Sequence, residues 1–259
     1  MGKFSGILLC SDFDGTLFDG EKIPQNNIEA IKYFRENGGL FTVITGRDYD
    51  FLPPFFEGID LGVPFINLNG SLFYDPIKKQ TVKDFFMEGM TKELVLRAFE
   101  NTPEAVRISL LPSVGRQRYF RGEEQSIPEE YCLKTRKVVF YTDKNVSQEV
   151  SDRALENVRA VLGDRFSVER SASFVIEVMD RRLTKSHAAR ILASEVGAHT
   201  LISVGDYEND IDMIVEADIG YAVANAHESV KAAADRVTVS AREGAIAAII
   251  YELDRELNK

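Results

Sequence analysis

The stretch Leu9-Cys10-Ser11-Asp12-Phe13-Asp14-Gly15-Thr16 places two carboxylates where a short apolar run ends in a glycine turn. The residues from 6 to 10 are predicted to form a buried strand. Residues i and i+2 of an extended segment point to the same side, so Asp12 and Asp14 are expected together at the strand's carboxyl end. Ligands of open α/β folds bind at this end of a parallel sheet, although such a pair also suits a turn or a helix cap.

Short apolar runs alternate with helical patterns at both ends of the chain, which favours parallel β-α units. Between them, consecutive strands with alternating patterns indicate an antiparallel α+β unit. We therefore predict an α/β fold with a Rossmann-like core, a parallel sheet with helices on both faces, formed by residues 1–81 and 184–259. Residues 82–183 are predicted to form an inserted α+β domain.

The predicted elements follow from hydrophobic periodicity and turn signals. The predicted core strands are 6–10, 40–45, 65–68, 200–204, 220–223 and 236–239, with a turn at Asn69-Gly70 leading into 71–74. The predicted core helices are 24–37, 186–196, 211–216, 228–234 and a closing helix, with a short helix or loop at 48–57. In the insertion we expect strands at 82–87, 105–111, 116–120, 136–141, 166–170 and 173–179, and helices at 92–101 and 147–162.

Composition excludes several classes of function. The 259 residues include 31 Lys and Arg against 41 Asp and Glu, a net charge of −10, and 44% are hydrophobic, as in a globular protein. Nucleic acid is an unsuitable partner because phosphate contacts need clustered cations, whereas a small phosphorylated substrate needs only a few. The apolar run at 7–10 is too short for a membrane anchor or signal peptide. Cys10 and Cys132 cannot form a disulfide framework, so we expect a cytoplasmic protein. From the charge and the short apolar run we expect neither a nucleic-acid nor a membrane partner. The sequence leaves the oligomeric state open.

A second acidic group, Gly205-Asp206-Tyr207-Glu208-Asn209-Asp210, also follows a predicted buried strand and precedes a helix. Asn209 or Asp210 can serve as the helix N-cap. In a parallel sheet, however, this group would share one crevice with Asp12. Like charges about 4 Å apart repel by roughly 4 kcal/mol at an effective dielectric of about 20, so a bound cation or a proton is expected. Oxygen ligands without a His or Cys cluster point to Mg²⁺ instead of zinc.

Two further segments suit an anion. Thr45-Gly46-Arg47 ends a predicted strand, where a hydroxyl and backbone N–H groups can face a phosphate. Lys185 lies near the start of a predicted helix and can balance charge in the crevice, although a lysine there is commonly solvated. In the insertion, Arg107, Arg116, Arg118 and Arg121 either form solvated faces or contact an anionic substrate.

These segments resemble, in order and spacing, the motifs of the haloacid dehalogenase superfamily, and specifically its Cof-like phosphatases with a large α/β cap. The gap between Thr45 and Lys185 is where that subgroup carries its cap. Ser186 departs from the pattern, since many relatives have Gly there. The segments similar to the four motifs are Asp12-Phe13-Asp14-Gly15-Thr16, Thr45-Gly46-Arg47, Lys185 and Gly205-Asp206-Tyr207-Glu208-Asn209-Asp210; Asn69-Gly70 and Asn225-Ala226 resemble lesser signatures.

The resemblance implies an Mg²⁺-dependent phosphatase acting on small phosphorylated metabolites, with sugar phosphates favoured. Asp12 would attack phosphorus and form an aspartyl-phosphate, while Asp14 would protonate the leaving oxygen and then activate water. Asp12, the backbone carbonyl of Asp14 and Asp206 would hold Mg²⁺. The implied phosphate-binding residues are Thr45, Gly46, Lys185 and Asn209, and the implied supporting residues are Asp210, which with Asn209 backs the metal, and Thr16.

Three alternatives remain at this point. A phosphomutase or phosphotransferase would pass the phosphoryl group to a sugar instead of water. A phospho-accepting signalling module also combines an acidic Mg²⁺ site with a Thr and a Lys, but Asp14 would speed loss of its phosphate, and it needs no inserted domain. A binding protein that has lost turnover is disfavoured because all the motif residues are present.

Overall fold

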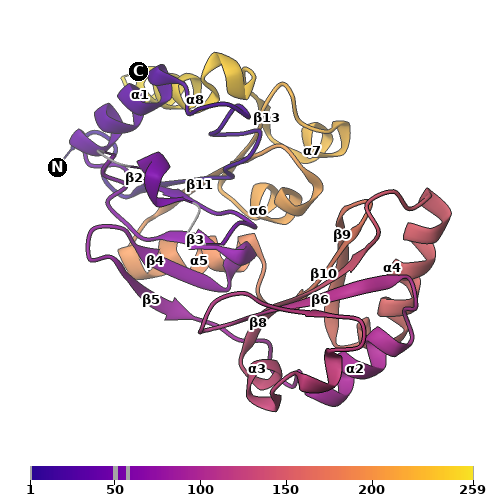
Figure 1. Ribbon diagram of the computed structural model, residues 1–259. Helices are drawn as coiled ribbons and strands as arrows, with labels where there is room; N and C mark the ends of the chain where they lie inside the picture. The colour runs from indigo at the N-terminus through magenta and orange to yellow at the C-terminus, as the bar shows by residue number, and fades with distance from the viewer. Residues whose placement is uncertain (1, 49–51, 57–58, 259) are drawn as a thin grey trace. The chain divides into compact units, whose positions relative to one another are not determined.

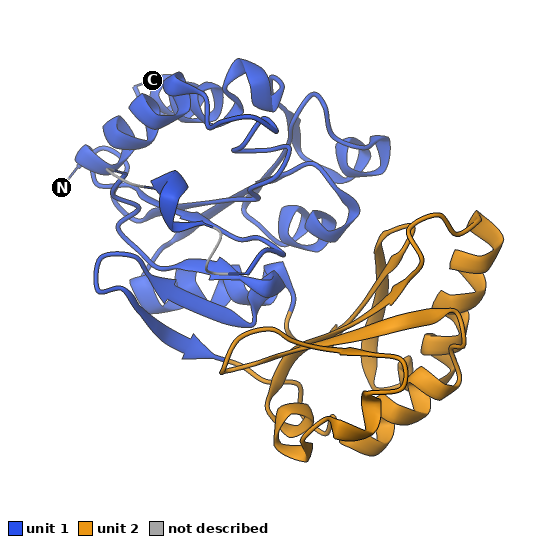
Figure 2. Cartoon of the chain, in the orientation of Figure 1, with its two compact units in different colours: residues 1–84, 184–259 blue, residues 85–183 orange. Residues whose placement is uncertain are grey.

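The computed structural model describes residues 2–48, 52–56 and 59–258. The chain divides into two compact units (Figure 2), unit 1 formed by Met1–Asp84 and Thr184–Lys259, and unit 2 formed by Phe85–Leu183. Among the described residues, no helix has the length and apolar character needed to cross a membrane.

Unit 1 contains a five-stranded sheet in the order β13-β12-β11-β1-β2, in which every neighbouring pair is parallel. The central strand β1 is flanked by β2, which follows it in the chain, and by β11, which comes after the insertion. The order therefore reverses around β1, and ligands of such sheets bind where it does. The strands are β1 (Ile7–Ser11), β2 (Leu40–Val43), β11 (Thr200–Gly205), β12 (Ile219–Ala222) and β13 (Arg236–Val237).

Helices cover both faces of this sheet, as predicted (Figure 1). On one face, α1 (Gln25–Glu36) and α8 (Ala245–Glu256) pack together, and their apolar residues join those of the strands in one buried cluster. On the other face lies α5 (Lys185–Val196), next to α6 (Ile211–Val215), while α7 (Glu228–Ala233) contacts β12. Burial of both faces explains why β1 is apolar without alternation.

A smaller antiparallel sheet, β3-β4-β5, adjoins β2 through bridges between the backbones of Ile44 and Ile66 and of Phe41 and Gly62. Because its last strand belongs to unit 1, this sheet corrects the predicted domain boundary. The predicted strand 82–87 is placed instead at Gln80–Asp84, and it pairs with β4 in unit 1, so the insertion begins at Phe85 and not at residue 82. The strands are β3 (Phe65–Asn67), β4 (Leu72–Asp75) and β5 (Gln80–Asp84).

Unit 2 is the predicted antiparallel α+β domain, with a five-stranded sheet in the order β7-β6-β8-β10-β9. Its buried apolar cluster joins one face of the sheet to α2 and α4 (Figure 1). Thr91 and Ser147 cap these two helices by accepting backbone N–H groups. The strands are β6 (Ala105–Pro112), β7 (Gln117–Phe120), β8 (Thr135–Thr142), β9 (Phe166–Ala172) and β10 (Val175–Asp180), and the helices are α2 (Lys92–Glu100), α3 (Glu129–Leu133) and α4 (Gln148–Leu162).

Two further differences from the predicted elements are local. The helix α3 was not predicted, because its five residues bury only Cys132 and are too few to show a helical period. The predicted strand 236–239 pairs only over Arg236–Val237. The segment 48–57 contains the short 3₁₀ helix Pro53–Phe56, and its remainder lies partly outside the described residues.

Candidate active site

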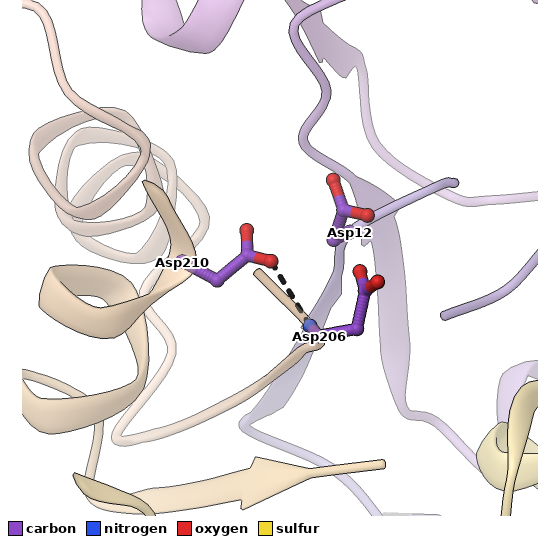
Figure 3. A group of neighbouring side chains, drawn as sticks. All are labelled: Asp12, Asp206 and Asp210. Carbon is purple, nitrogen blue, oxygen red and sulfur yellow. Dashed lines mark hydrogen bonds between the residues drawn. The ribbon is translucent and has the colours of Figure 1, made fainter. Parts of the chain in front are cut away.

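The parallel pairing of β1 with β11 brings the two acidic segments together. Ser11 is in register with Val204, and the backbone N–H of Asp12 donates to the carbonyl of Val204 at 2.9 Å. Asp12 therefore leaves β1 beside the point where Asp206 leaves β11. Figure 3 shows the side chains of Asp12, Asp206 and Asp210 directed toward one another. One oxygen of each of the three carboxylates lies within 4.8 Å of the others.

Lys185 lies in this cluster and is only 3% exposed. Its Nζ donates to Asp12 Oδ1 at 2.5 Å and to Asp210 Oδ1 at 2.6 Å. Thr184 fixes the position of the lysine, because its hydroxyl accepts the backbone N–H of His187 and so begins α5 at Lys185. The structure therefore places Lys185 inside the crevice, where its ammonium offsets carboxylate charge, and not at a solvated helix end.

Asp210 organises the loop after β11. Its Oδ2 accepts the backbone N–H groups of Asp206 and Tyr207 at 3.0 and 3.1 Å, and its Oδ1 accepts Lys185. Both oxygens of this fully buried carboxylate thus have donors. Gly205 permits the close approach, because a Cβ there would lie 2.4 Å from the Cβ of Asp210.

The carboxylates repel one another in this enclosed place. Burial raises the pKa of Asp12 well above its usual range, Lys185 opposes the rise, and Asp210 adds to it. Burial and repulsion from Asp210 also raise the pKa of Asp206 to about 6. Burial alone would lower the pKa of Lys185, but Asp12 and Asp210 hold it above its usual range. An additional cation would relieve this crowding.

The donor set fits a hard divalent cation. Lys185 donates to Oδ1 of Asp12, and the Thr16 hydroxyl donates to Oδ1 of Asp206 at 3.0 Å. The other oxygen of each carboxylate, Oδ2, accepts no hydrogen bond from the described residues. The backbone carbonyl of Asp14 is likewise without a donor in this part of the chain. Two carboxylate oxygens and a carbonyl oxygen are the ligands that Mg²⁺ prefers, with waters completing its shell.

Asp14 does not join the cluster of carboxylates. Its side chain is 44% exposed and forms a two-point ion pair with Arg47, Nε to Oδ2 at 2.5 Å and Nη2 to Oδ1 at 2.6 Å. Such fork-like pairing fixes the orientation of a carboxylate. The sequence placed Arg47 directly after Thr45-Gly46 but did not predict its ion pair with Asp14.

The loop after β2 is supported by a second, unusual loop. Thr45 is buried, and its hydroxyl accepts the backbone N–H of Arg47. The carbonyls of Thr45 and Arg47 accept the backbone N–H groups of Asn69 and Leu68. Leu68, Asn69 and Gly70 all have φ values in the left-handed region, which is costly for leucine and is commonly retained at functional sites. The predicted turn at Asn69-Gly70 therefore holds Thr45 and Gly46 in place.

The comparisons with known proteins agree with this geometry. The family model of the haloacid dehalogenase-like hydrolases matches residues 9–250. The chain belongs to this family. A relative from Bacillus subtilis (strain 168), named 5-amino-6-(5-phospho-D-ribitylamino)uracil phosphatase YitU, is 22% identical over 95% of this chain and 96% of its own.

Solved structures of family members share the fold. A haloacid dehalogenase-like hydrolase from Bacteroides thetaiotaomicron aligns with a TM-score of 0.77 at 21% identity, covering 95% of this chain and 98% of its own. The subclass IIB sugar phosphatase BT4131 aligns with a TM-score of 0.74 at 21% identity, again over 95% and 98%. The predicted family membership is confirmed.

Within this family member, the predicted site residues fall into three groups. The first group is one hydrogen-bonded cluster formed by Asp12, Asp206, Asp210, Lys185 and Thr16. The second is Asp14, which pairs with Arg47. The third is Thr45 and Gly46, which lie in the loop after β2 that the turn at Asn69-Gly70 supports. Asn209 is exposed, and its side chain makes no hydrogen bond to the described residues. Sequence reasoning gave no role to Asn225, whose amide joins the carbonyl of Gly15 to the backbone N–H of Ala241. Its only signal was the similarity of Asn225-Ala226 to a lesser signature.

Gly15→Ala is expected to disturb the cluster directly. Gly15 has φ +77°, and a Cβ there would lie 2.4 Å from Asp206 Oδ2. The backbone strain costs about 1–2 kcal/mol, and displacement of Asp206 is expected to raise the divalent-cation concentration for half-maximal activity by roughly 10–100-fold. Gly20→Ala is the matched control, because Gly20 has φ +99° but nothing within 4 Å. An equal requirement for the divalent cation in both variants would show that Gly15 does not position Asp206.

Proposed function

We propose that this chain is a Mg²⁺-dependent phosphatase that hydrolyses phosphate monoesters of small metabolites through a covalent phosphate on Asp12. The observation that supports this most is the placement of Asp12. Its carboxylate lies at the end of the central strand, where Oδ1 accepts a hydrogen bond from the buried Lys185. The other oxygen, Oδ2, accepts no hydrogen bond from the described residues. An oriented carboxylate with a free oxygen, close to a cation, is suited to nucleophilic attack.

The first step joins Asp12 Oδ2 to phosphorus and breaks the bond from phosphorus to the leaving oxygen, which takes a proton from Asp14. In the second step, water attacks phosphorus and gives a proton to Asp14, and the bond from phosphorus to Asp12 breaks. The products are the alcohol and inorganic phosphate. Splitting hydrolysis into two displacements lowers each barrier.

The proton transfer requires a change at Asp14. In the ion pair with Arg47, both of its oxygens are engaged by the guanidinium. Asp14 must turn from Arg47 to reach a leaving oxygen, and the 44% exposure of its side chain leaves room for this rotation. Arg47 is then the residue that holds Asp14 between turnovers.

Charge on the transferring group is balanced from two sides. Lys185 contributes a buried ammonium, and the loop after β2 contributes the hydroxyl of Thr45 and the backbone N–H of Gly46, since the N–H groups of Thr45 and Arg47 donate within the protein. Bound Mg²⁺, held by Asp12, Asp206 and the carbonyl of Asp14, would neutralise charge on the phosphoryl oxygens. Asp210 and Thr16 orient Lys185 and Asp206.

The proposed substrates are sugar phosphates or similar metabolites. This rests on the named relatives, since YitU is named for a phosphorylated ribityl compound and BT4131 is titled a sugar phosphatase. We propose that unit 2 is the cap domain, which determines substrate specificity. Cys10 and Cys132 are both buried free thiols, in keeping with the predicted cytoplasmic location.

A panel of phosphorylated metabolites, assayed for phosphate release with and without Mg²⁺, tests the proposal. We expect release from at least one sugar phosphate, loss of that activity with EDTA, and recovery with added Mg²⁺. An added sugar acceptor should not divert the phosphoryl group. Transfer to the sugar would replace hydrolysis with phosphotransfer, and a long-lived phosphate on Asp12 without turnover would favour a signalling module.

A further inference from the structure

Ser186, the position at which this chain departs from the pattern of its motifs, has a specific partner in the structure. Its side chain is buried, and its hydroxyl donates to Glu216 Oε2 at 2.5 Å. Ser186 is the second residue of α5, directly after Lys185, and Glu216 is the residue at which α6 ends. The hydrogen bond therefore joins the first turn of α5 to the end of α6, two helices that contact each other.

Lys185 and Ser186 together attach the start of α5 to both ends of α6. Lys185 Nζ donates to Asp210, which directly precedes α6, and Ser186 donates to Glu216, which directly follows it. Consecutive residues of a helix point about 100° apart around its axis, and the five residues of α6 span about 7 Å, so the two bonds reach well-separated points. Two attachments fix both the position and the direction of α6 relative to the first turn of α5, which one alone would not.

The proposed reaction makes a demand on Lys185 that the second attachment meets. An ammonium has three N–H donors, and two of them already donate to Asp12 and Asp210. In the reaction a donor must reach a phosphoryl oxygen, so the contacts of Lys185 redistribute as the phosphoryl group arrives and leaves. The bond between Ser186 and Glu216 takes no part in this exchange, and it keeps the first turn of α5 in place throughout.

Glu216 is a strong acceptor for the serine hydroxyl. The hydrogen bond from Ser186 lowers the pKa of Glu216 below its usual range, and Arg190 Nη1 donates to the same oxygen at 2.6 Å. A hydrogen bond to an ionised carboxylate is roughly twice as strong as one between neutral groups. Because α5 has no acidic residue in its own first turn, Glu216 also supplies the negative charge that stabilises a helix N-terminus.

We propose that Ser186 and Glu216 are positioning residues, which fix the first turn of α5 against α6 and so hold Lys185 and Asp210 in the geometry that the reaction needs. Both act through Lys185 and Asp210, to which the two helices link them. Their effect on turnover rests on the proposed function, whereas their effect on the hydrogen bonds around Asp210 does not.

Steady-state kinetics on a substrate found in the panel measures the effect on turnover. Glu216→Ala is expected to lower kcat by roughly tenfold or more with little change in KM, because Lys185 acts mainly on the charge of the transferring group. Ser186→Ala should act in the same way, and the double variant should lose little more than either single variant. Glu216→Gln keeps an acceptor for the serine hydroxyl and should recover part of the loss.

Glu195→Ala is the matched control. Glu195 lies at the other end of α5, where its carboxylate pairs with Lys83, and its side chain is 46% exposed, against 44% for Glu216. The control should leave kcat unchanged. Urea denaturation checks that each variant is fully folded under the conditions of the assay.

Amide hydrogen exchange gives a readout that needs no turnover. The backbone N–H groups of Asp206 and Tyr207 donate to Asp210 Oδ2, so their exchange rates report how firmly Asp210 is held. In the metal-free protein, followed by NMR, both amides should exchange roughly tenfold faster in the two alanine variants, while amides in α8 keep the wild-type rate. The control should match the wild type at every one of these amides.

The two readouts separate this proposal from the proposed function. If the wild type hydrolyses no ester of the panel, faster exchange at Asp206 and Tyr207 still supports the positioning of Asp210, and only the proposed function fails. Exchange rates at both amides equal to those of the control would overturn the proposal. So would a kcat in both Ser186→Ala and Glu216→Ala equal to that of Glu195→Ala in an active enzyme.

Discussion

Asp12→Asn is expected to abolish turnover, with kcat lower by roughly 10⁴-fold or more, as for other substitutions of a nucleophile. The amide cannot form a covalent phosphate, and no neighbouring carboxylate can replace it. Asp206 is held by Thr16, and Asp210 has both oxygens engaged by Lys185 and the backbone. Steady-state assays at saturating Mg²⁺ measure the loss.

The same substitution is expected to leave the fold intact. Burial disfavours the charged form of Asp12, so an uncharged side chain of equal size removes a penalty in the metal-free protein. Asp206→Asn is the control, because it removes charge from the cluster but keeps the nucleophile, and its lost activity should recover in part at high Mg²⁺. Near-normal turnover by Asp12→Asn would refute the assignment of the nucleophile.

Lys185→Met is expected to cost about 3–5 kcal/mol of stability in the metal-free protein and to abolish activity. The methionine fills similar space but leaves Asp12 and Asp210 buried without a cation. Removing one partner of a buried ion pair costs more than the pair itself contributes, because the remaining charge keeps its desolvation penalty. Urea denaturation of the metal-free protein measures the change in free energy of unfolding.

A double variant separates charge from packing. Asp12→Asn combined with Lys185→Met removes one of the two stranded charges, so its loss of stability should be smaller than that of Lys185→Met alone. Lys231, which is partly exposed and pairs with the exposed Glu228, is the surface comparison, and Lys231→Met should cost at most about 1 kcal/mol. A loss below about 1 kcal/mol for Lys185→Met would show that the lysine does not neutralise the cluster.

The sequence predicted the meeting of Asp12 and Asp206 because both follow apolar strands, and the carboxyl ends of parallel strands meet at one edge of a sheet. Asp210 was expected in the same crevice and as a cap or supporting residue, but its contact with Lys185 was not predicted, because it depends on how α5 begins at Thr184. The ion pair of Asp14 and Arg47 was not predicted, since it depends on the left-handed turn at Leu68 and Asn69 that supports the loop. Contacts between loops leave no periodic pattern in a sequence.

The inserted domain shows the same limit. Its strands were predicted from alternation, but the strand before Phe85 pairs with β4 across a short turn, and alternation within a strand does not reveal which strand it pairs with. The four arginines looked alike in the sequence. Only the structure separates Arg121, which donates to three carbonyls, from Arg107 and Arg116, which meet at Tyr141.

Chemical trapping of the phosphorylated enzyme tests the role of Asp12 most directly. The enzyme is mixed with Mg²⁺ and a substrate found in the panel, quenched during turnover and treated with borohydride, which reduces an aspartyl-phosphate to homoserine. We expect peptide mass spectrometry to find homoserine at position 12 in the wild type and at no position in Asp12→Asn. Homoserine at another aspartate, or steady turnover without any at position 12, would contradict a covalent phosphate on Asp12.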